Sequence, residues 1–387
     1  MRHRDDTIGA DRAGPAPRRA LPAPPGDFIG LAGKVHLATG GEPPLLEAHR
    51  AAFEAFARDK SDGFDGYWRH WQVAGEVRAR LARWLGLEPG DVALLGNASE
   101  GIMRVVAGLD WQPGDNAVVA ALDYASGRFA LASLKRRGVA LRLVPADGWR
   151  LDEARLVAAC DGRTRLVYVS QVNALTGQHL DIPAISRGLE GGPAALLVDA
   201  SHALGAVPVA GGQADFTVSC CYKFALGIHE GVLGWNRRRR PDFVPAGAGW
   251  CSGAAGTDPG DFVPEADARQ AEYGNAGHLG AYLLRESLDY LEGYGIEAIA
   301  AHLRGLSGRL VEGMSGLGLD VMTPAEPARR AGNAAFAHPA AEAVRRRAAR
   351  EGILVWADNG RLRASAHLFT RPGDVELLIE RLPALLG

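Results

Sequence analysis

Three side chains capable of acid–base or nucleophilic chemistry follow two consecutive apolar runs. Asp199 ends the run ALLVDA, His202 lies three residues later, and Lys223 follows FTVSCC. A buried carboxylate is costly unless a positive group meets it, whereas a partly desolvated lysine amine is nucleophilic and can form a Schiff base. Structural alternatives stay open, because Asp199 could cap a helix or pair with His202, and Lys223 could lie on an ordinary rim. Lysine occurs at only four positions of the chain, which draws attention to this one.

Two further features lie between predicted strands and helices. The segment GNASEGI (96–102) places Ala98 and Ser99 at a helix N-terminus, where free backbone amides can bind a phosphate. Tyr124 follows another apolar run and could stack on a ring. A plain helix cap and a rim aromatic are the structural alternatives. A phosphate cradle, a stacking ring, a carboxylate and an amine are the groups that a pyridoxal 5′-phosphate (PLP) site requires.

These residues are positioned by short apolar runs that alternate with helical patterns. Such runs predict a mostly parallel α/β sheet covered by helices on both faces, and ligands bind such sheets at the carboxyl ends of the strands. We therefore expect Asp199 and Lys223 to meet at one edge of the sheet. The predicted strands cover residues 92–96, 116–122, 141–146, 165–170, 195–200 and 216–221, with helices starting near 99 and 127.

The rest of the chain predicts a second, α+β region and an N-terminal arm. A short strand (34–39) and two helices (43–58 and 71–85) precede the sheet, and helices and short strands follow it. The sequence therefore predicts a Pro- and Arg-rich disordered tail, an arm that joins the small domain, a large cofactor domain and a C-terminal small domain. Their expected bounds are 1–27, 28–60, 61–265 and 266–387.

Composition narrows the functional class. The net charge of −2 gives no global basic field for nucleic acid or a membrane surface, and no run of about 18 apolar residues predicts a membrane span. The adjacent Cys220 and Cys221 would point to opposite faces of a strand, so no metal site is expected. The few unpatterned cysteines favour reduced thiols in a cytoplasmic protein.

From about residue 34 onward, the sequence resembles the class V aminotransferases within the fold-type I PLP enzymes. The resemblance rests on VDASHALGAVPV, VSQVNALTGQHLDI and LRASAHLFTRPGDVELLI, in that order. It implies a seven-stranded sheet in the large domain. By this resemblance, Lys223 forms the Schiff base, Asp199 meets the pyridine nitrogen, and Arg363 grips the substrate carboxylate. The other implied cofactor contacts are His202, Gln171 and Asn173 around the phenolic oxygen or ring, Tyr124 on the ring, and Ala98, Ser99, Cys220 and Tyr222 around the phosphate.

Within this family, CCYKF, AGWCS and YGNAGHLG look most like kynureninase. That branch implies a homodimer with shared active sites, in which Trp250 and Asn275 approach the phosphate across the interface; ordinary interface packing is the alternative. The chain departs from the family in FALGIHEGVLGW, where His229 and Glu230 replace a glycine- and proline-rich turn. These two residues either face the substrate or belong to a solvated loop.

The expected function is PLP chemistry on an α-amino acid, as a lyase, hydrolase or transaminase. The shared residues do not choose among these reactions, and the side-chain pocket is expected near His229, Glu230, Trp250 and His278. No cysteine follows Cys251, so the resemblance does not imply the persulfide mechanism of cysteine desulfurases. The alternatives are a C–S lyase or epimerase of a biosynthetic pathway, or a non-catalytic scaffold of the same fold.

Overall fold

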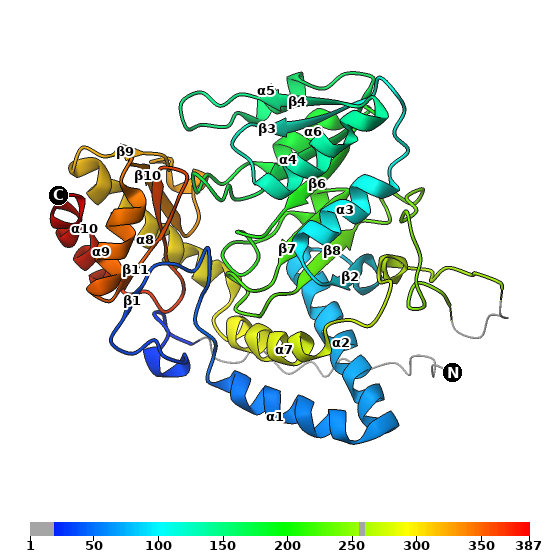
Figure 1. Ribbon diagram of the computed structural model, residues 1–387, viewed down its shortest axis with the longest axis horizontal. Helices are drawn as coiled ribbons and strands as arrows, with labels where there is room; N and C mark the ends of the chain where they lie inside the picture. The colour runs from blue at the N-terminus through cyan, green and yellow to red at the C-terminus, as the bar shows by residue number, and fades with distance from the viewer. Residues whose placement is uncertain (1–18, 255–259) are drawn as a thin grey trace.

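A computed structural model describes residues 19–254 and 260–387 (Figure 1). At its centre is a seven-stranded sheet with the order β2-β8-β7-β6-β5-β3-β4. Only β8 runs antiparallel to its neighbours among the described strands of this sheet, so the predicted mostly parallel α/β sheet is confirmed. The strands are β2 (Val92–Leu95), β3 (Asn116–Ala120), β4 (Ala140–Val144), β5 (Thr164–Ser170), β6 (Ala195–Asp199), β7 (Phe216–Cys220) and β8 (Gly231–Trp235).

Helices cover both faces of this sheet (Figure 1). One face packs against α3 and α4, and the other against α5 and α6, with α2 and α7 continuing that layer over β2 and β8. Burial on both sides explains why the strands read as continuous apolar runs. The helices are α2 (Gly63–Leu85), α3 (Ala98–Gly108), α4 (Ala125–Ala132), α5 (Glu153–Ala158), α6 (Ile182–Leu189) and α7 (His278–Glu292).

The C-terminal region contains an antiparallel four-stranded sheet with the order β12-β13-β10-β9. Helices α8, α9 and α10 pack against it around a separate apolar core, as the predicted α+β pattern indicates. The elements are α8 (Ile296–Gly316), β9 (Asp320–Val321), β10 (Asn333–Ala337), α9 (Ala341–Arg350), β11 (Ile353–Leu354), β12 (Trp356–Asp358), β13 (Arg361–Ser365) and α10 (Pro372–Leu386).

The N-terminal arm packs onto this C-terminal region (Figure 1). Strand β1 (Val35–His36) pairs in parallel with β11. Phe28 and Leu37 belong to the same apolar cluster as Phe336 of β10. The next helix, α1 (Ala48–Ser61), lies against α2 and α7 instead. The arm therefore links the two halves of the molecule.

Residues 19–27 differ from the tail expected at the N-terminus, while residues 1–18 lie outside the described part. The Arg19 N–H donates to the Gly293 carbonyl over 2.9 Å, and the Tyr290 hydroxyl donates to Asp27 over 2.8 Å. Ala23 is buried in the C-terminal core. These contacts attach a segment whose composition alone predicts disorder.

Two helix starts and two strands also differ from expectation. Helix α1 begins five residues later than predicted, at Ala48, because Leu46 forms a bridge with Phe28. Helix α2 begins eight residues earlier, at Gly63. The sequence pattern did not reveal β8 or β10, both of which are rich in glycine or alanine.

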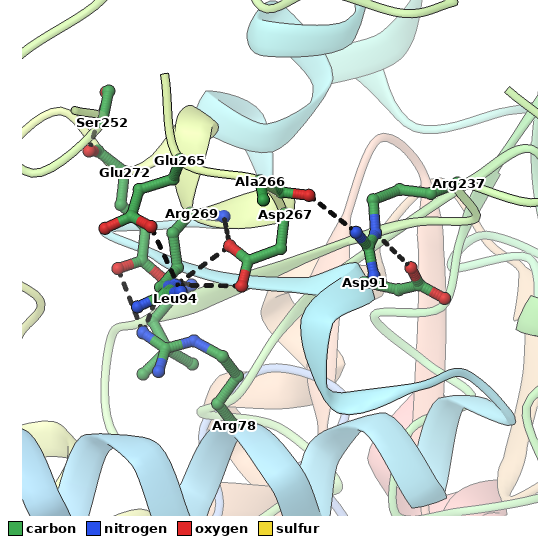
Figure 2. A network of polar contacts seen from close by, with 10 residues as sticks. All are labelled: Arg78, Asp91, Leu94, Arg237, Ser252, Glu265, Ala266, Asp267, Arg269 and Glu272. Atoms are coloured by element: carbon green, nitrogen blue, oxygen red, sulfur yellow. Dashed lines mark hydrogen bonds and ion pairs between the residues drawn. The ribbon is translucent and has the colours of Figure 1, made fainter. Parts of the chain in front are cut away.

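A polar network attaches the segment before α7 to the large sheet (Figure 2). The buried Glu272 carboxylate accepts from Arg78 of α2 and from the Leu94 N–H of β2, each over 2.8 Å. Arg237 donates to Asp91 over 2.7 Å and to the Ala266 carbonyl over 2.8 Å. These bonds fix the path of the chain into α7.

No helix in the described ranges is long and apolar enough to cross a bilayer.

Candidate active site

A cavity lies at the carboxyl ends of the strands of the large sheet, where the sequence predicted a ligand site. The loops after β2, β3, β5, β6 and β7 all contribute to its wall. The structure therefore brings together eight of the predicted residues. These are Ala98, Ser99, Tyr124, Asp199, His202, Cys220, Tyr222 and Lys223.

The amine of Lys223 lies inside this cavity beside His202. The lysine side chain is 7% exposed, and its Nζ is 3.3 Å from His202 Nε2 and 5.5 Å from the centroid of the Tyr124 ring. Burial, reinforced by the nearby cations, lowers the pKa of His202 well below its usual value. The lysine amine therefore faces a neutral imidazole rather than a second charge.

Asp199 presents a carboxylate held on both oxygens at the end of β6. Oδ1 accepts from the Ser201 N–H over 2.8 Å, and Oδ2 accepts from the Tyr168 hydroxyl over 2.9 Å. The side chain lines the cavity. A carboxylate stabilised by two donors is suited to meet a protonated ring nitrogen.

The N-terminus of α3 forms the other end of the cavity. Asn97 caps the helix, since its side chain accepts from the Glu100 N–H over 2.8 Å. The first amides of a helix have no intrahelical acceptor, so those of Ala98 and Ser99 are suited to an anion. Ser99 Oγ also lies 2.8 Å from Ser126 Oγ, at the start of α4. This arrangement fits a phosphate group.

Arg363 of β13 carries a guanidinium without a carboxylate partner among the described residues. It is 3% exposed, donates to the carbonyl of Ala174 over 2.8 Å, and its Nε has no partner in the part of the chain that the structure describes. The neighbouring Arg361, by contrast, pairs with Asp358 over 2.7 Å. Burial lowers the pKa of Arg363 to about 9, and Arg361 adds to this effect. The arginine is therefore suited to bind an incoming carboxylate.

A glycine turn of the N-terminal arm covers this arginine. A Cβ added to Gly40 would lie 2.7 Å from Ser365 Oγ and 3.0 Å from both Arg363 Nη2 and His202 Cε1. The next residue, Gly41, presses against the indole of Trp356. The arm thus contacts residues from both halves of the site.

Two predicted cofactor contacts lie outside the cavity. The Gln171 amide donates to the Pro208 carbonyl over 2.8 Å and accepts from the Ala210 N–H over 3.0 Å. Asn173 accepts from the N–H groups of the next turn. Val172 and Ala174 line the cavity instead, because successive residues of extended chain face opposite ways. The structure does not bring these two amides to the site.

Trp250 and Asn275 also lie outside the cavity formed by one chain. Trp250 is 57% exposed and its ring stands edge-on to Trp71. The Asn275 side chain accepts from the Tyr67 hydroxyl over 3.1 Å. The phosphate contact across a dimer interface that the sequence assigns to them stays a prediction.

The two residues of the unusual turn after Lys223 point in different directions. His229 stacks on Tyr222 at 4.3 Å between ring centroids and is exposed, with Glu42 3.8 Å away. Glu230 instead lies over Gly277 and Gly280 at the start of α7. Only His229, through Tyr222, borders the cavity wall.

The structure adds site residues that the sequence reasoning missed. Tyr168 stands inside a continuous apolar run, where a core role is the natural interpretation. Asn333, in the alanine-rich β10, places Nδ2 3.0 Å from His202 Nδ1. A polar residue within a strand of small residues is only a weak sign of a functional site. The contact of Asn333 with His202 becomes visible only when the two halves of the molecule are folded together.

Comparison with known proteins agrees with this geometry. A family model described as "Aminotransferase class-V" matches residues 57–365. The chain belongs to the class V aminotransferase family. PLP is the cofactor of this family.

Two curated relatives are similar over part of their length. A probable cysteine desulfurase of Methanothermobacter thermautotrophicus is 30% identical over 59% of this chain and 58% of the relative. A kynureninase of Xanthomonas euvesicatoria is 30% identical over 66% of this chain and 65% of the relative. The chain thus spans less than two thirds of the length of each relative.

A solved structure of the cystine C–S lyase C-DES, in complex with its reaction product cysteine persulfide, shares the fold. The TM-score is 0.85 at 22% identity, over 92% of this chain and 98% of that one. The likeness confirms the fold-type I architecture.

Proposed function

We propose that this chain acts on an α-amino acid with PLP, as a lyase, hydrolase or transaminase of kynureninase-like type. The observation that carries the proposal is the Lys223 amine, 3.3 Å from the neutral His202 in a cavity that also contains Asp199. The buried guanidinium of Arg363, which has no carboxylate partner in the described part of the chain, supports an amino-acid substrate, since it can bind the α-carboxylate through two hydrogen bonds.

The residues present fit the cofactor. Lys223 would hold it covalently, Asp199 would hold the ring nitrogen in its protonated form, and Tyr124 would stack on the ring. The amides of Ala98 and Ser99 would bind its phosphate. When bound, PLP supplies an electron sink for the bond that breaks at Cα.

The chain's own residues then handle the proton and the carboxylate. Lys223 Nζ would act as the base that removes the α-proton. His202 stays neutral, so it places no second positive charge beside that amine. Arg363 orients the substrate by its carboxylate.

Cys220 is a cysteine of the cavity wall, and it is poorly suited to sulfur transfer. Burial raises the pKa of its thiol, which disfavours the nucleophilic thiolate. No cysteine follows Cys251. These facts favour a reaction without a protein persulfide.

A C–S lyase that releases its product directly is the second candidate, supported by the fold shared with C-DES. A non-catalytic scaffold is less well supported, because the site retains its lysine, carboxylate and arginine together. An epimerase would use these same residues and stays an alternative.

We also propose a cytoplasmic homodimer in which Trp250 and Asn275 serve the partner's phosphate site. The bounds expected from the sequence are a large domain (61–265), a small domain (266–387) and an arm (28–60) joined to the small domain. Because α1 and α7 pack with α2 over the large sheet, we propose that both belong with the large domain and that the small domain begins at α8. Support comes from the exposed Trp250 and from the pairing of β1 with β11. Light scattering tests the dimer, and an active monomer would contradict it.

Absorbance tests the cofactor and product analysis tests the reaction. The purified protein should bind PLP with a visible absorbance band that resists dialysis. Lys223→Ala should lose this band, whereas the exposed Lys135→Ala should keep it. If the band is equal in both variants, the lysine assignment is wrong.

An amino-acid panel analysed by mass spectrometry then separates the reactions. A keto acid indicates transamination, pyruvate with ammonia indicates elimination, and alanine indicates cleavage within the side chain. A protein that binds PLP but turns over no amino acid would favour the scaffold.

A further inference from the structure

Tyr168 lies in β5, next to the strand that ends in Asp199. The tyrosine is fully buried, and its hydroxyl donates to Asp199 Oδ2 over 2.9 Å. The other oxygen of that carboxylate accepts from the Ser201 N–H over 2.8 Å. Both carboxylate oxygens therefore have a fixed donor inside the protein.

The hydroxyl of Tyr168 keeps its proton and so remains a donor. Burial, together with the nearby carboxylates of Asp199 and Asp123, raises the pKa of this tyrosine well above its usual value. Asp123 does not compete for the hydroxyl, because it accepts from the N–H groups of Ser170 and Tyr124, each over 2.9 Å. Of these two carboxylates, the Tyr168 hydroxyl therefore donates only to that of Asp199.

The ring of Tyr168 is held in place by a close helix. A Cβ added to Gly127 of α4 would lie 2.2 Å from Tyr168 Cε1. No side chain larger than hydrogen fits there without moving the ring or the helix. This packing leaves the phenol little freedom to turn away from Asp199.

We propose that Tyr168 is a positioning residue that acts through Asp199. Its hydroxyl donates to the Asp199 carboxylate and holds that carboxylate toward the cavity. A proton shared between Asp199 and the ring nitrogen of PLP therefore stays on the nitrogen, where the electron sink requires it. This inference rests on the proposed PLP function and names a residue outside the cavity wall that tunes it.

The test is Tyr168→Phe loaded with PLP that carries ¹⁵N in its ring. In the wild-type protein, the nitrogen should give the chemical shift of a protonated pyridine. In Tyr168→Phe, the signal should move toward that of the neutral ring. PLP should also bind about 10- to 150-fold more weakly, which is the effect expected for the loss of one hydrogen bond to a charged group.

The matched control is Tyr282→Phe, which removes another hydrogen bond from a buried tyrosine to an aspartate, the half-buried Asp59, away from the cavity. It should alter stability without moving the ¹⁵N signal. In an Asp199→Asn background, Tyr168→Phe should have almost no further effect on PLP affinity, because the carboxylate through which it acts is gone.

A ¹⁵N shift in Tyr168→Phe equal to that of the wild type would overturn the proposal. If Tyr168→Phe does not fold, 3-fluorotyrosine at position 168 keeps the packing and strengthens the donor; it should preserve the protonated signal, and a shift toward the neutral ring would also refute the idea. A wild-type protein that binds no PLP would instead refute the proposed function itself.

Discussion

Glu230→Gln is the substitution whose effect follows most directly from the structure. The Glu230 carboxyl lies against Gly277 and Gly280, where a Cβ added to Gly280 would come within 1.8 Å of the carboxyl carbon. Burial raises the pKa of Glu230 from 4.5 to about 8. The folded protein therefore keeps this carboxyl protonated at pH values at which an unfolded chain ionises it.

The sign of the pH dependence follows from this difference. Below about pH 4.5 both states hold the proton, and Glu230 makes no difference to the pH dependence of stability. As the pH rises toward 8, unfolding releases a proton and the free energy of unfolding falls. The full shift from 4.5 to about 8 corresponds to at most ~5 kcal/mol. Local relaxation and water reduce this, so we expect about 2 kcal/mol.

Urea unfolding of the wild type and Glu230→Gln between about pH 5 and pH 8 checks this expectation. Glutamine has the same shape and cannot ionise, so the variant should gain about 2 kcal/mol relative to the wild type across this range. The exposed Glu190→Gln is the control and should follow the wild type at every pH. Parallel curves for the wild type and Glu230→Gln would refute the reasoning.

Three further substitutions probe the substrate side. Gly40→Ala places a methyl group 3.0 Å from Arg363 Nη2. This overpacking should cost about 1–3 kcal/mol and weaken amino-acid binding, measured from the cofactor absorbance, by about 5- to 150-fold. The control Gly75→Ala, whose added Cβ has nothing within 4 Å, should leave amino-acid binding unchanged. Arg363→Lys should weaken the same binding at least about tenfold, because lysine cannot make the paired hydrogen bonds; equal affinity would exclude a carboxylate contact. Asn333→Ala should slow α-proton exchange in D₂O, followed by NMR, about fivefold through loss of one neutral hydrogen bond to His202, and an unchanged rate would remove Asn333 from the site.

The sequence predicted the sheet and the polar residues that meet at one edge of it for a physical reason. Continuous apolar runs specify buried strands, and polar residues at the ends of parallel strands must share one edge. Asp199 and Lys223 follow from these local rules. The family resemblance added Arg363, whose position beside the cavity depends on the fold of the second region.

The residues that the sequence misjudged depend on the direction of a side chain. Gln171 and Asn173 belong to the expected segment, but the extended chain turns Val172 and Ala174 toward the cavity instead. Tyr168 shows the converse, since a residue inside an apolar run directs its one polar atom at Asp199. Sequence spacing fixes which segment reaches a site, whereas backbone register decides which of its side chains arrive.

The pairing of β1 with β11 has a consequence for how the protein is made. During synthesis, the segment that carries Lys223 leaves the ribosome well before β11 and β13 exist. The arm must therefore wait for its strand partner, and Gly40 meets Arg363 only after nearly the whole chain has emerged. We expect the part of the cavity around Asp199 and Lys223 to form first on the nascent chain, and the contact between the arm and Arg363 to form last.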